Sequence, residues 1–459
     1  MLIKNPELLI TEENPFAEDA FNRKAEIEKL TNILSFTKEP FVLAVTSPWG
    51  NGKTQFLKMW RIYLMNKGVN SIYYNAWEND YVDDPLISLI GEISSQIDQI
   101  QFTEKTKGKR ALNKVKKISA EILKRSIPAL VKVLSAGVID DKIISELASE
   151  TTVDIIKEKI KDYEISKKSI VNLKSELKKF VESLDTKEEC PLPFVFFIDE
   201  LDRCKPDFAI ELLERAKHLF NIPGILFVLA LDRNQLEQSV KAIFGMNNPD
   251  GYIRKFIDLE YYLLEPEKGD FSNYLIRRFK IDDFVHNLRD GKTQLEDLED
   301  ITSELFKLFD LKLRQQEQFF SQLAIILKIF PMESDYFFNY LCFFLLLSNY
   351  YRKKFLDFIN REMSGERLLE FIERFEGKEE FFESYSPCCI EVFLYHFFND
   401  KILVKQKIED YQKRSSDIKE NSSRPRIIVG IYQRLQHMDA KNILKTTINR
   451  ITFSEQFVR

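Results

Sequence analysis

Short apolar runs alternate with stretches of helical spacing along the first part of the chain, up to about residue 264. The segments Phe56–Leu64 and Ile165–Leu184 carry apolar residues at helical spacing, which is typical of amphipathic helices. Apolar runs that alternate with such helices predict a parallel, doubly wound α/β sheet. The expected strands are Phe41–Thr46, Ser71–Trp77, Phe194–Ile198, Ile225–Leu231 and Phe256–Leu263.

Two long segments interrupt or follow this alternation. An insertion of about a hundred residues separates the second and third expected strands, which is far longer than an ordinary connection. Its first part is strongly basic, because Glu104–Lys132 holds ten Lys and Arg residues against two Glu. From Glu265 onward the pattern is helical and rich in phenylalanine. We therefore expect an α/β core in two parts, 1–100 and 166–264, a charged helical insertion at 101–165, and an all-α domain at 265–459.

Composition narrows the class of protein. The 459 residues carry a formal net charge of −5, which excludes a chain that is basic overall, as many DNA-coating proteins are. The five cysteines lack CxxC spacing, so we expect no disulfide framework and a reducing, cytoplasmic location. The longest apolar stretches, Ile127–Ile139 and Tyr340–Leu347, fall short of the roughly 18 residues of a membrane span. Both are expected to be buried core helices, and no transmembrane span is predicted.

A phosphate-binding loop is the strongest local motif. Ser47–Thr54 follows an expected strand, opens a helix and matches GxxxxGK[ST], except that serine occupies the first glycine position. Glycines let backbone N–H groups approach a phosphate chain, the lysine adds a positive charge, and the threonine hydroxyl coordinates Mg²⁺. The alternative is a glycine turn at a helix start with an exposed lysine. The expected nucleotide contacts are Trp49, Gly50, Asn51, Gly52, Lys53, Thr54 and Gln55.

Two adjacent acids end the third expected strand. Asp199 and Glu200 follow the apolar run Phe194–Ile198. An acid at the tip of a buried strand can hold Mg²⁺, and a second acid beside it can orient or deprotonate water. We therefore expect Asp199, with Thr54, to bind the metal and Glu200 to act as the catalytic base. An apolar strand that ends in an acid is also common without any such function.

The motifs together resemble the KAP family of P-loop NTPases. The resemblance rests on Trp49-Gly50-x-Gly52-Lys53-Thr54, on Asn75-Ala76-Trp77 and on Ile198-Asp199-Glu200-Leu201-Asp202-Arg203-Cys204-Lys205-Pro206. The later Leu231-Asp232-Arg233 and Tyr252-Ile253-Arg254-Lys255-Phe256-Ile257 are also similar to the family. The resemblance implies that Lys53 and Thr54 bind phosphate and Mg²⁺, that Asp199 is the metal acid and that Glu200 is the base. Membrane hairpins are frequent in this family, and none is expected here.

Further site residues follow from the resemblance, each with a structural alternative. Asp232 matches the family's polar sensor position, and it could equally cap a helix before Leu236 and Val240. Arg203 and Arg254 are candidates to reach a γ-phosphate, or they form ion pairs with the acids at 199–202 or with Asp258. Arg314 is a candidate nucleotide sensor or an ordinary exposed helix residue. The indoles of Trp49 and Trp77 are expected to pack against the sheet or a helix.

Three functional hypotheses remain at this point. The first is a Mg²⁺-dependent ATPase that couples ATP binding and hydrolysis to conformational change; ATP is favoured over GTP because the chain lacks an NKxD sequence. The second is a nucleotide-switched scaffold with negligible turnover. The third gives the basic segment 104–132 a contact with nucleic acid or an anionic membrane surface, against the alternative of a solvated helix face. The resemblance also suggests bacterial defence against phages and plasmids, with protein partners from the same operon or a homo-oligomer.

Overall fold

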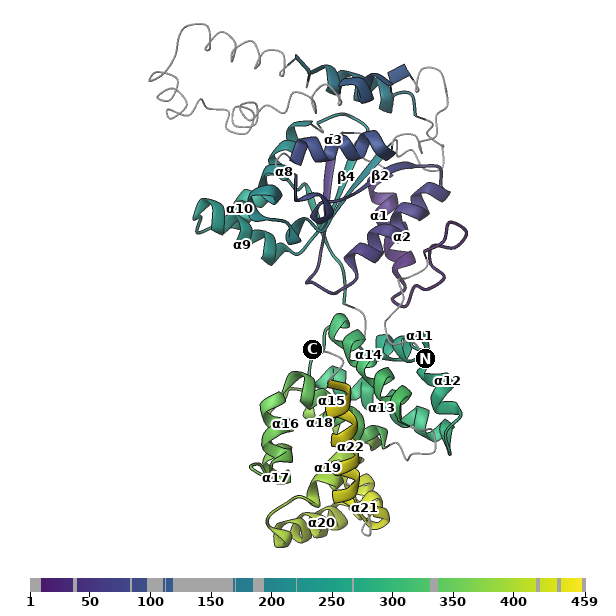
Figure 1. The fold of residues 1–459 in the computed structure, drawn as a ribbon, viewed down its shortest axis with the longest axis vertical. Helices are drawn as coiled ribbons and strands as arrows, with labels where there is room; N and C mark the ends of the chain where they lie inside the picture. The colour runs from purple at the N-terminus through teal and green to yellow at the C-terminus, as the bar shows by residue number, and fades with distance from the viewer. Residues whose placement is uncertain are drawn as a thin grey trace. The chain divides into compact units, whose positions relative to one another are not determined.

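The computed structural model describes most of the chain outside the long insertion. The described residues are 10–35, 39–82, 85–96, 110–111, 113–118, 168–169, 171–184, 194–219, 221–265, 268–330, 337–417, 422–435 and 439–455. The chain divides into two compact units, one of which carries the sheet and ends at Leu264, while the other begins at Glu265 (Figure 1).

The first unit is built on a five-stranded, entirely parallel sheet with the order β2-β3-β4-β1-β5. This confirms the α/β fold class expected from the sequence. The fifth strand is shorter than expected, and the second ends before Trp77 because a 3₁₀ turn, Trp77–Asn79, begins there. The strands are β1 Phe41–Thr46, β2 Asn70–Asn75, β3 Phe194–Asp199, β4 Ile225–Leu231 and β5 Leu259–Tyr262.

Helices cover both faces of this sheet (Figure 1). On one face, α1 (Arg23–Ser35) and α2 (Lys53–Asn66) bury Leu30 and Trp60 against Val228 and other strand residues. On the opposite face, residues of α3, α8 and α9 and of the segment 171–184 pack against Phe196, Phe227 and their neighbours. All residues of β3 and β4 are buried, as expected for strands covered on both sides. The further bounds in this unit are α3 Pro85–Gln96, η3 Leu201–Arg203, α8 Pro206–Leu219, α9 Arg233–Phe244 and α10 Pro249–Ile253.

Only a short part of the expected insertion, 101–165, is described, namely 110–111 and 113–118. It is helical and amphipathic, because Ala111 and Val115 join the core on one face of the sheet while Lys114 is exposed and forms an ion pair with Glu176. This short part fits a solvated basic helix face. The rest of the basic segment, including Ile127–Ile139, lies outside the described residues.

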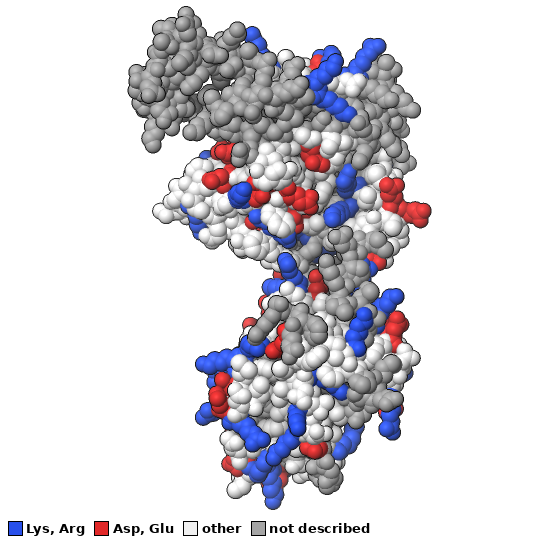
Figure 2. Space-filling view, viewed as in Figure 1, with Lys and Arg blue, Asp and Glu red and all other residues white. Residues whose placement is uncertain are grey.

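The second unit is helical, as the sequence indicated. Its central helix, α15 (Phe338–Tyr350), is buried from Phe338 to Ser348, so Tyr340–Leu347 is a core helix as predicted. No helix in the described part of the chain is long and apolar enough to cross a membrane. Lys and Arg side chains are spread over the visible face of this unit with acidic side chains between them (Figure 2). The bounds are α11 Lys268–Arg278, α12 Ile281–His286, α13 Gly291–Leu308, α14 Leu313–Ile329, α16 Arg352–Ile359, α17 Gly365–Ile372, α18 Lys378–Phe381, α19 Tyr385–Tyr395, α20 Lys401–Ser415, α21 Arg424–Leu435 and α22 Ala440–Glu455.

Candidate functional site

The candidate residues meet at the carboxyl edge of the sheet. Because all strands are parallel, the loop after β1, Asn75 at the end of β2, Asp199 at the end of β3 and Asp232 after β4 lie at the same edge. The pairing register places Asn75 opposite Asp199, and the amide N–H of Ala76 donates to the Asp199 carbonyl oxygen at 2.9 Å. In parallel α/β sheets this edge is where ligands bind.

The loop between β1 and α2 has the backbone of a phosphate-binding turn. Gly50 has a φ of 92°, and Gly52 has a φ of 81° and is the N-cap of α2 without any side-chain cap. A Cβ atom at Gly52 would meet nothing within 4 Å, so the left-handed backbone, and not the space, requires glycine there. Ser47 continues the strand pairing, since its N–H donates to the Leu231 carbonyl oxygen at 3.3 Å. That position needs no positive φ, which explains why serine fits where the motif has glycine.

Lys53 is buried under this loop. Its ammonium donates to the carbonyl oxygens of Ser47 at 2.7 Å and of Pro48 at 3.2 Å, and the residue is only 9% exposed. Burial lowers the pKa of Lys53, while the nearby carboxylates of Asp202, Asp232 and Asp199 act to raise it. The alternative for this motif, a glycine turn with an exposed lysine, is therefore wrong.

Asp199 joins the loop to the end of β3. Its carboxylate accepts hydrogen bonds from the Tyr73 hydroxyl at 2.6 Å and from the Glu200 amide at 2.8 Å, and the Thr54 side chain lies close enough to act on it. The residue is 1% exposed, and burial raises the pKa of its carboxyl, although Tyr73, Thr54 and the Glu200 amide act to lower it. The two residues expected to share a metal ion thus lie close together.

Glu200 is held in a strained backbone conformation beside this pair. Its φ of 58° is in the left-handed region, which is uncommon for a residue with a side chain. One carboxylate oxygen accepts from Asn75 Nδ2 at 3.2 Å, and the other forms an ion pair with Arg203 at 2.9 Å. Burial raises the pKa of Glu200, and the charge of Arg203 opposes that shift. The side chain is 12% exposed, so it lies at the boundary between the protein interior and solvent.

Asp232 has both of the arrangements that the sequence left open. One carboxylate oxygen caps α9 by accepting from the amides of Asn234 and Gln235, while the other accepts from the amide of Trp49 at 3.1 Å. It therefore ties the loop after β1 to the end of β4. The Trp49 indole N–H in turn donates to Asp202.

The two indoles do not pack as expected. Trp49 is 48% exposed and Trp77 is 50% exposed, so neither is covered by the sheet or a helix. Instead, Trp49 bonds to Asp202, and Arg203 lies over the ring of Trp77 with 5.6 Å between the guanidinium carbon and the ring centroid.

The three candidate arginines take different positions. Arg203 lies in the site, bound to Glu200. Arg254 pairs with Asp250 at 2.7 Å, not with Asp258, and its side chain is 72% exposed. Arg314 is an exposed residue of α14 in the helical unit. The structure thus brings Arg203 to the other site residues, whereas Arg254 is paired elsewhere and Arg314 belongs to the other unit.

Sequence reasoning missed three polar residues that shape the site. Tyr73 donates to Asp199, Asn75 donates to Glu200, and Asp202 accepts from Trp49. Asn75 and Asp202 lie inside the motifs that carried the family resemblance, and this was the available signal. Tyr73 could be found only once the β2–β3 pairing was known, because its hydroxyl reaches across to the neighbouring strand.

The donor set fits Mg²⁺ and a triphosphate. Thr54 and Asp199 offer hydroxyl and carboxylate oxygens, which hard cations such as Mg²⁺ prefer. Asp202 Oδ1 is buried and has no hydrogen-bond partner among the described residues, so the site holds uncompensated acceptor capacity beside Lys53. The left-handed glycines and the N-terminus of α2 provide the backbone geometry that favours an anion.

The chain is similar to several known proteins and to one family model. The phage T7 exclusion protein of Escherichia coli (strain K12) is 25% identical to the chain over 114 residues, which cover 25% of this chain and 15% of that protein. Two structures of the Aeropyrum pernix ORC2 protein, in the ADPNP–ADP and ADP forms, align with 94% and 98% of this chain and 94% and 95% of theirs. Their identities are 12% and 13%, and each TM-score is 0.32. Residues 23–330 match the KAP family P-loop domain, so the chain belongs to the KAP family and carries a P-loop domain of the kind that binds nucleotides.

Proposed function

We propose that the chain is a Mg²⁺-dependent ATPase that couples ATP binding and hydrolysis to a conformational change. The proximity of Thr54 to the Asp199 carboxylate carries the proposal, because it brings the phosphate-binding loop beside the acid of a strand distant in sequence. Bound Mg²⁺ would neutralise charge on the β- and γ-phosphates, and Thr54 and Asp199 would hold it.

Lys53 supplies the positive charge for the phosphates in this proposal. Its ammonium is already buried next to the loop and needs only to exchange the carbonyl oxygens of Ser47 and Pro48 for phosphate oxygens. The burial that lowers its pKa also lowers the desolvation that phosphate binding requires. The backbone at Gly50 and Gly52 contributes N–H donors.

Glu200 orients and deprotonates the attacking water in this proposal. Its raised pKa brings the carboxylate closer to the range in which a general base works well. Asn75 and Arg203 each engage one of its two oxygens, and the remaining lone pairs of the carboxylate can accept from water. Asn75 acts as a positioning residue, whereas Arg203 is the candidate that leaves Glu200 for the γ-phosphate. Arg254 could serve across a contact with a second copy of the chain, while Arg314 receives no role.

Steady-state phosphate release tests this assignment. Lys53→Ala is expected to remove nucleotide binding, and Glu200→Gln is expected to retain ATP while hydrolysis is lost. Lys58→Ala is the matched control, because Lys58 is an exposed residue of the same helix. Unchanged hydrolysis in both site variants would contradict the proposal. ATP binding without turnover in the wild type would instead support the nucleotide-switched scaffold.

We also propose a role in excluding phages, supported by the short match to the phage T7 exclusion protein. The aligned region spans only 15% of that relative, so the role rests on this short match alone. Plating efficiency of phage T7 on E. coli cells that express the chain should fall relative to cells that express Lys53→Ala. Equal plating on both strains would refute a nucleotide-dependent role in exclusion of this phage. Co-purification from the native host would test the expected partners from the same operon.

A further inference from the structure

A cavity lies in the sheet unit, away from the phosphate-binding loop. It has a volume of about 300 Å³ and is lined by residues at the start of β1, in β4 and in α8, together with the chain just before β5. The loop that holds Lys53 follows the opposite, carboxyl end of β1. The cavity is therefore separate from the proposed nucleotide site, although both are built on the same strand.

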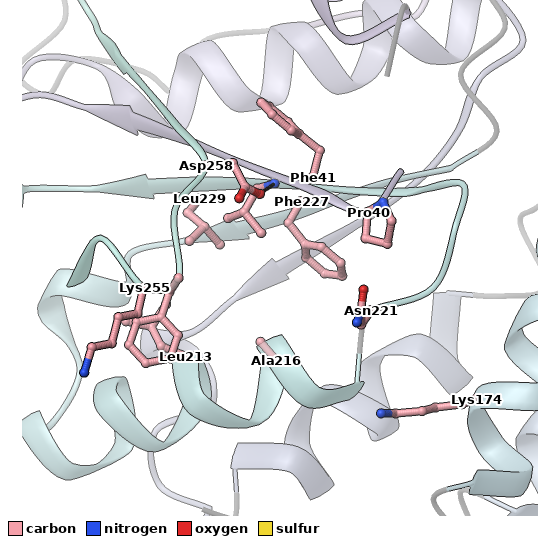
Figure 3. A pocket seen from close by; sticks show the side chains of 12 residues that line it. Pro40, Phe41, Lys174, Leu213, Ala216, Asn221, Phe227, Leu229, Lys255 and Asp258 are labelled. Atoms are coloured by element: carbon pink, nitrogen blue, oxygen red, sulfur yellow. Dashed lines mark hydrogen bonds between the residues drawn. The ribbon is translucent and has the colours of Figure 1, made fainter. Parts of the chain in front are cut away.

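The walls of this cavity are mostly apolar. Val42, Leu213, Phe227 and Leu229 form its sheet and helix sides, and Phe227 projects between the sheet and α8 (Figure 3). Ala216 faces the same space from α8, where its small side chain leaves room. A volume of this size is at the lower end of the range for small-molecule pockets, which runs from about 300 to 1,000 Å³.

Lys174 is the charged lining residue that bears most on which ligand the cavity can bind. It reaches toward the cavity from the segment 171–184, which is separate from the other walls (Figure 3). The residue is half-buried, and burial lowers the pKa of its ammonium. Among the described residues no hydrogen-bond or ion-pair partner is found for it. A neighbour on the same helix, Lys179, has by contrast an acidic partner, Glu176, at 2.7 Å.

The other charged groups of the cavity, Asp258 and Lys255, are already engaged. The Asp258 carboxylate accepts from the Val42 amide at 2.8 Å. The Lys255 ammonium lies over the Tyr252 ring, and Figure 3 shows its side chain directed away from the labelled wall residues. Among the described residues that line the cavity, Lys174 is thus the cation that remains for a ligand.

We propose that this cavity binds a small amphipathic carboxylate, with its apolar part against Phe227 and Leu229 and its carboxylate on Lys174. An apolar ligand part removes the exposed wall from water, and a carboxylate supplies the charge partner that the half-buried ammonium lacks among the described residues. The ligand class is a short-chain or medium-chain acyl carboxylate or an aromatic acid of similar size.

Calorimetric titration with octanoate tests the proposal, with octanol as the uncharged probe of equal chain length. Wild type is expected to bind octanoate at least tenfold more tightly than octanol. Lys174→Met should weaken octanoate binding about tenfold, the loss expected for one charge-assisted hydrogen bond, and should leave octanol binding unchanged. Lys178→Met is the matched control, because Lys178 lies one turn further along the same helix and is 58% exposed.

A second variant tests the location independently of charge. Ala216→Phe fills the cavity and should abolish binding of both probes, while the melting temperature shows whether the variant is folded. If that variant unfolds, Leu229→Ala enlarges the cavity and should change the affinity for both probes. Absence of octanoate binding at millimolar concentration, equal affinity for octanol, or full binding by Lys174→Met would each overturn the proposal. Because none of these measurements involves ATP, they are independent of the proposed hydrolase activity.

Discussion

Replacing Asp199 by Asn is expected to stabilise the protein while it removes metal–nucleotide binding. Asp199 is 1% exposed, and burial raises the pKa of its carboxyl. An asparagine keeps an acceptor oxygen for the Glu200 amide and offers an amide to the oxygens of Tyr73 or Thr54. At most one hydrogen bond is weakened, at a cost of about 1 kcal/mol. Removing the buried charge is worth several kcal/mol, so the free energy of unfolding should rise by about 1–2 kcal/mol. Gains of this size are common for stabilising changes at functional sites.

Thermal unfolding of the purified chain measures this gain. For a unit of this size, about 1–2 kcal/mol corresponds to a rise in melting temperature of about 2–8 °C. The folded-state pKa of Asp199 is raised above its unfolded value, so ionisation costs more in the folded protein than in the unfolded chain. The advantage of Asn should therefore be absent below about pH 3.9, the unfolded value, grow as pH rises toward the folded-state pKa, and be complete above it.

Asp250 provides the opposite control. Arg233 and Arg254 lower the pKa of Asp250, so its contribution is present above the unfolded pKa and is lost as pH falls. Asp250→Asn should therefore lower the melting temperature at neutral pH. A lower melting temperature for Asp199→Asn than for wild type would refute the view that Asp199 is a destabilising charge kept for function.

Three further predictions follow from particular contacts. The rate of hydrolysis should fall at low pH, with a midpoint above about pH 4.3, the ordinary glutamate pKa, because burial raises the pKa of Glu200. If residual hydrolysis by Glu200→Gln kept the same fall at low pH, this prediction would be contradicted. Asn75→Asp puts a second carboxylate beside Glu200, so the midpoint should move to higher pH with ATP affinity unchanged, as a pH–rate profile would show. In the helical unit, Arg424→Met leaves the fully buried Glu391 without its 2.8 Å ion pair and should cost about 3–5 kcal/mol in urea unfolding, with partial recovery on adding Glu391→Leu.

The sequence was most informative where the signal was local. The loop at Ser47–Thr54 and the acids after Phe194–Ile198 each lie within a few residues of a strand end, so pattern and motif sufficed to place them. The parallel sheet then follows from the alternation of strands and helices, and it brings the two motifs to one edge.

Contacts that depend on strand pairing could not be predicted in the same way. Tyr73 reaches Asp199 only because β2 lies beside β3, which no local pattern indicates.

Two local contacts also differ from expectation. The partner of Arg254 is Asp250, one helical turn earlier, whereas the sequence suggested Asp258. The exposed indole of Trp49 likewise reflects a loop whose polar contacts, and not its hydrophobicity, fix the side chain.

The shared metal–nucleotide site is tested most directly by Mn²⁺ binding measured by electron paramagnetic resonance, with Mn²⁺ in place of Mg²⁺. We expect one tight Mn²⁺ per chain that requires ATP and is lost in both Thr54→Ala and Asp199→Asn. Tight binding that persists in both variants, or wild-type protein that binds no Mn²⁺ with ATP, would contradict the assignment of these two residues to one metal ion.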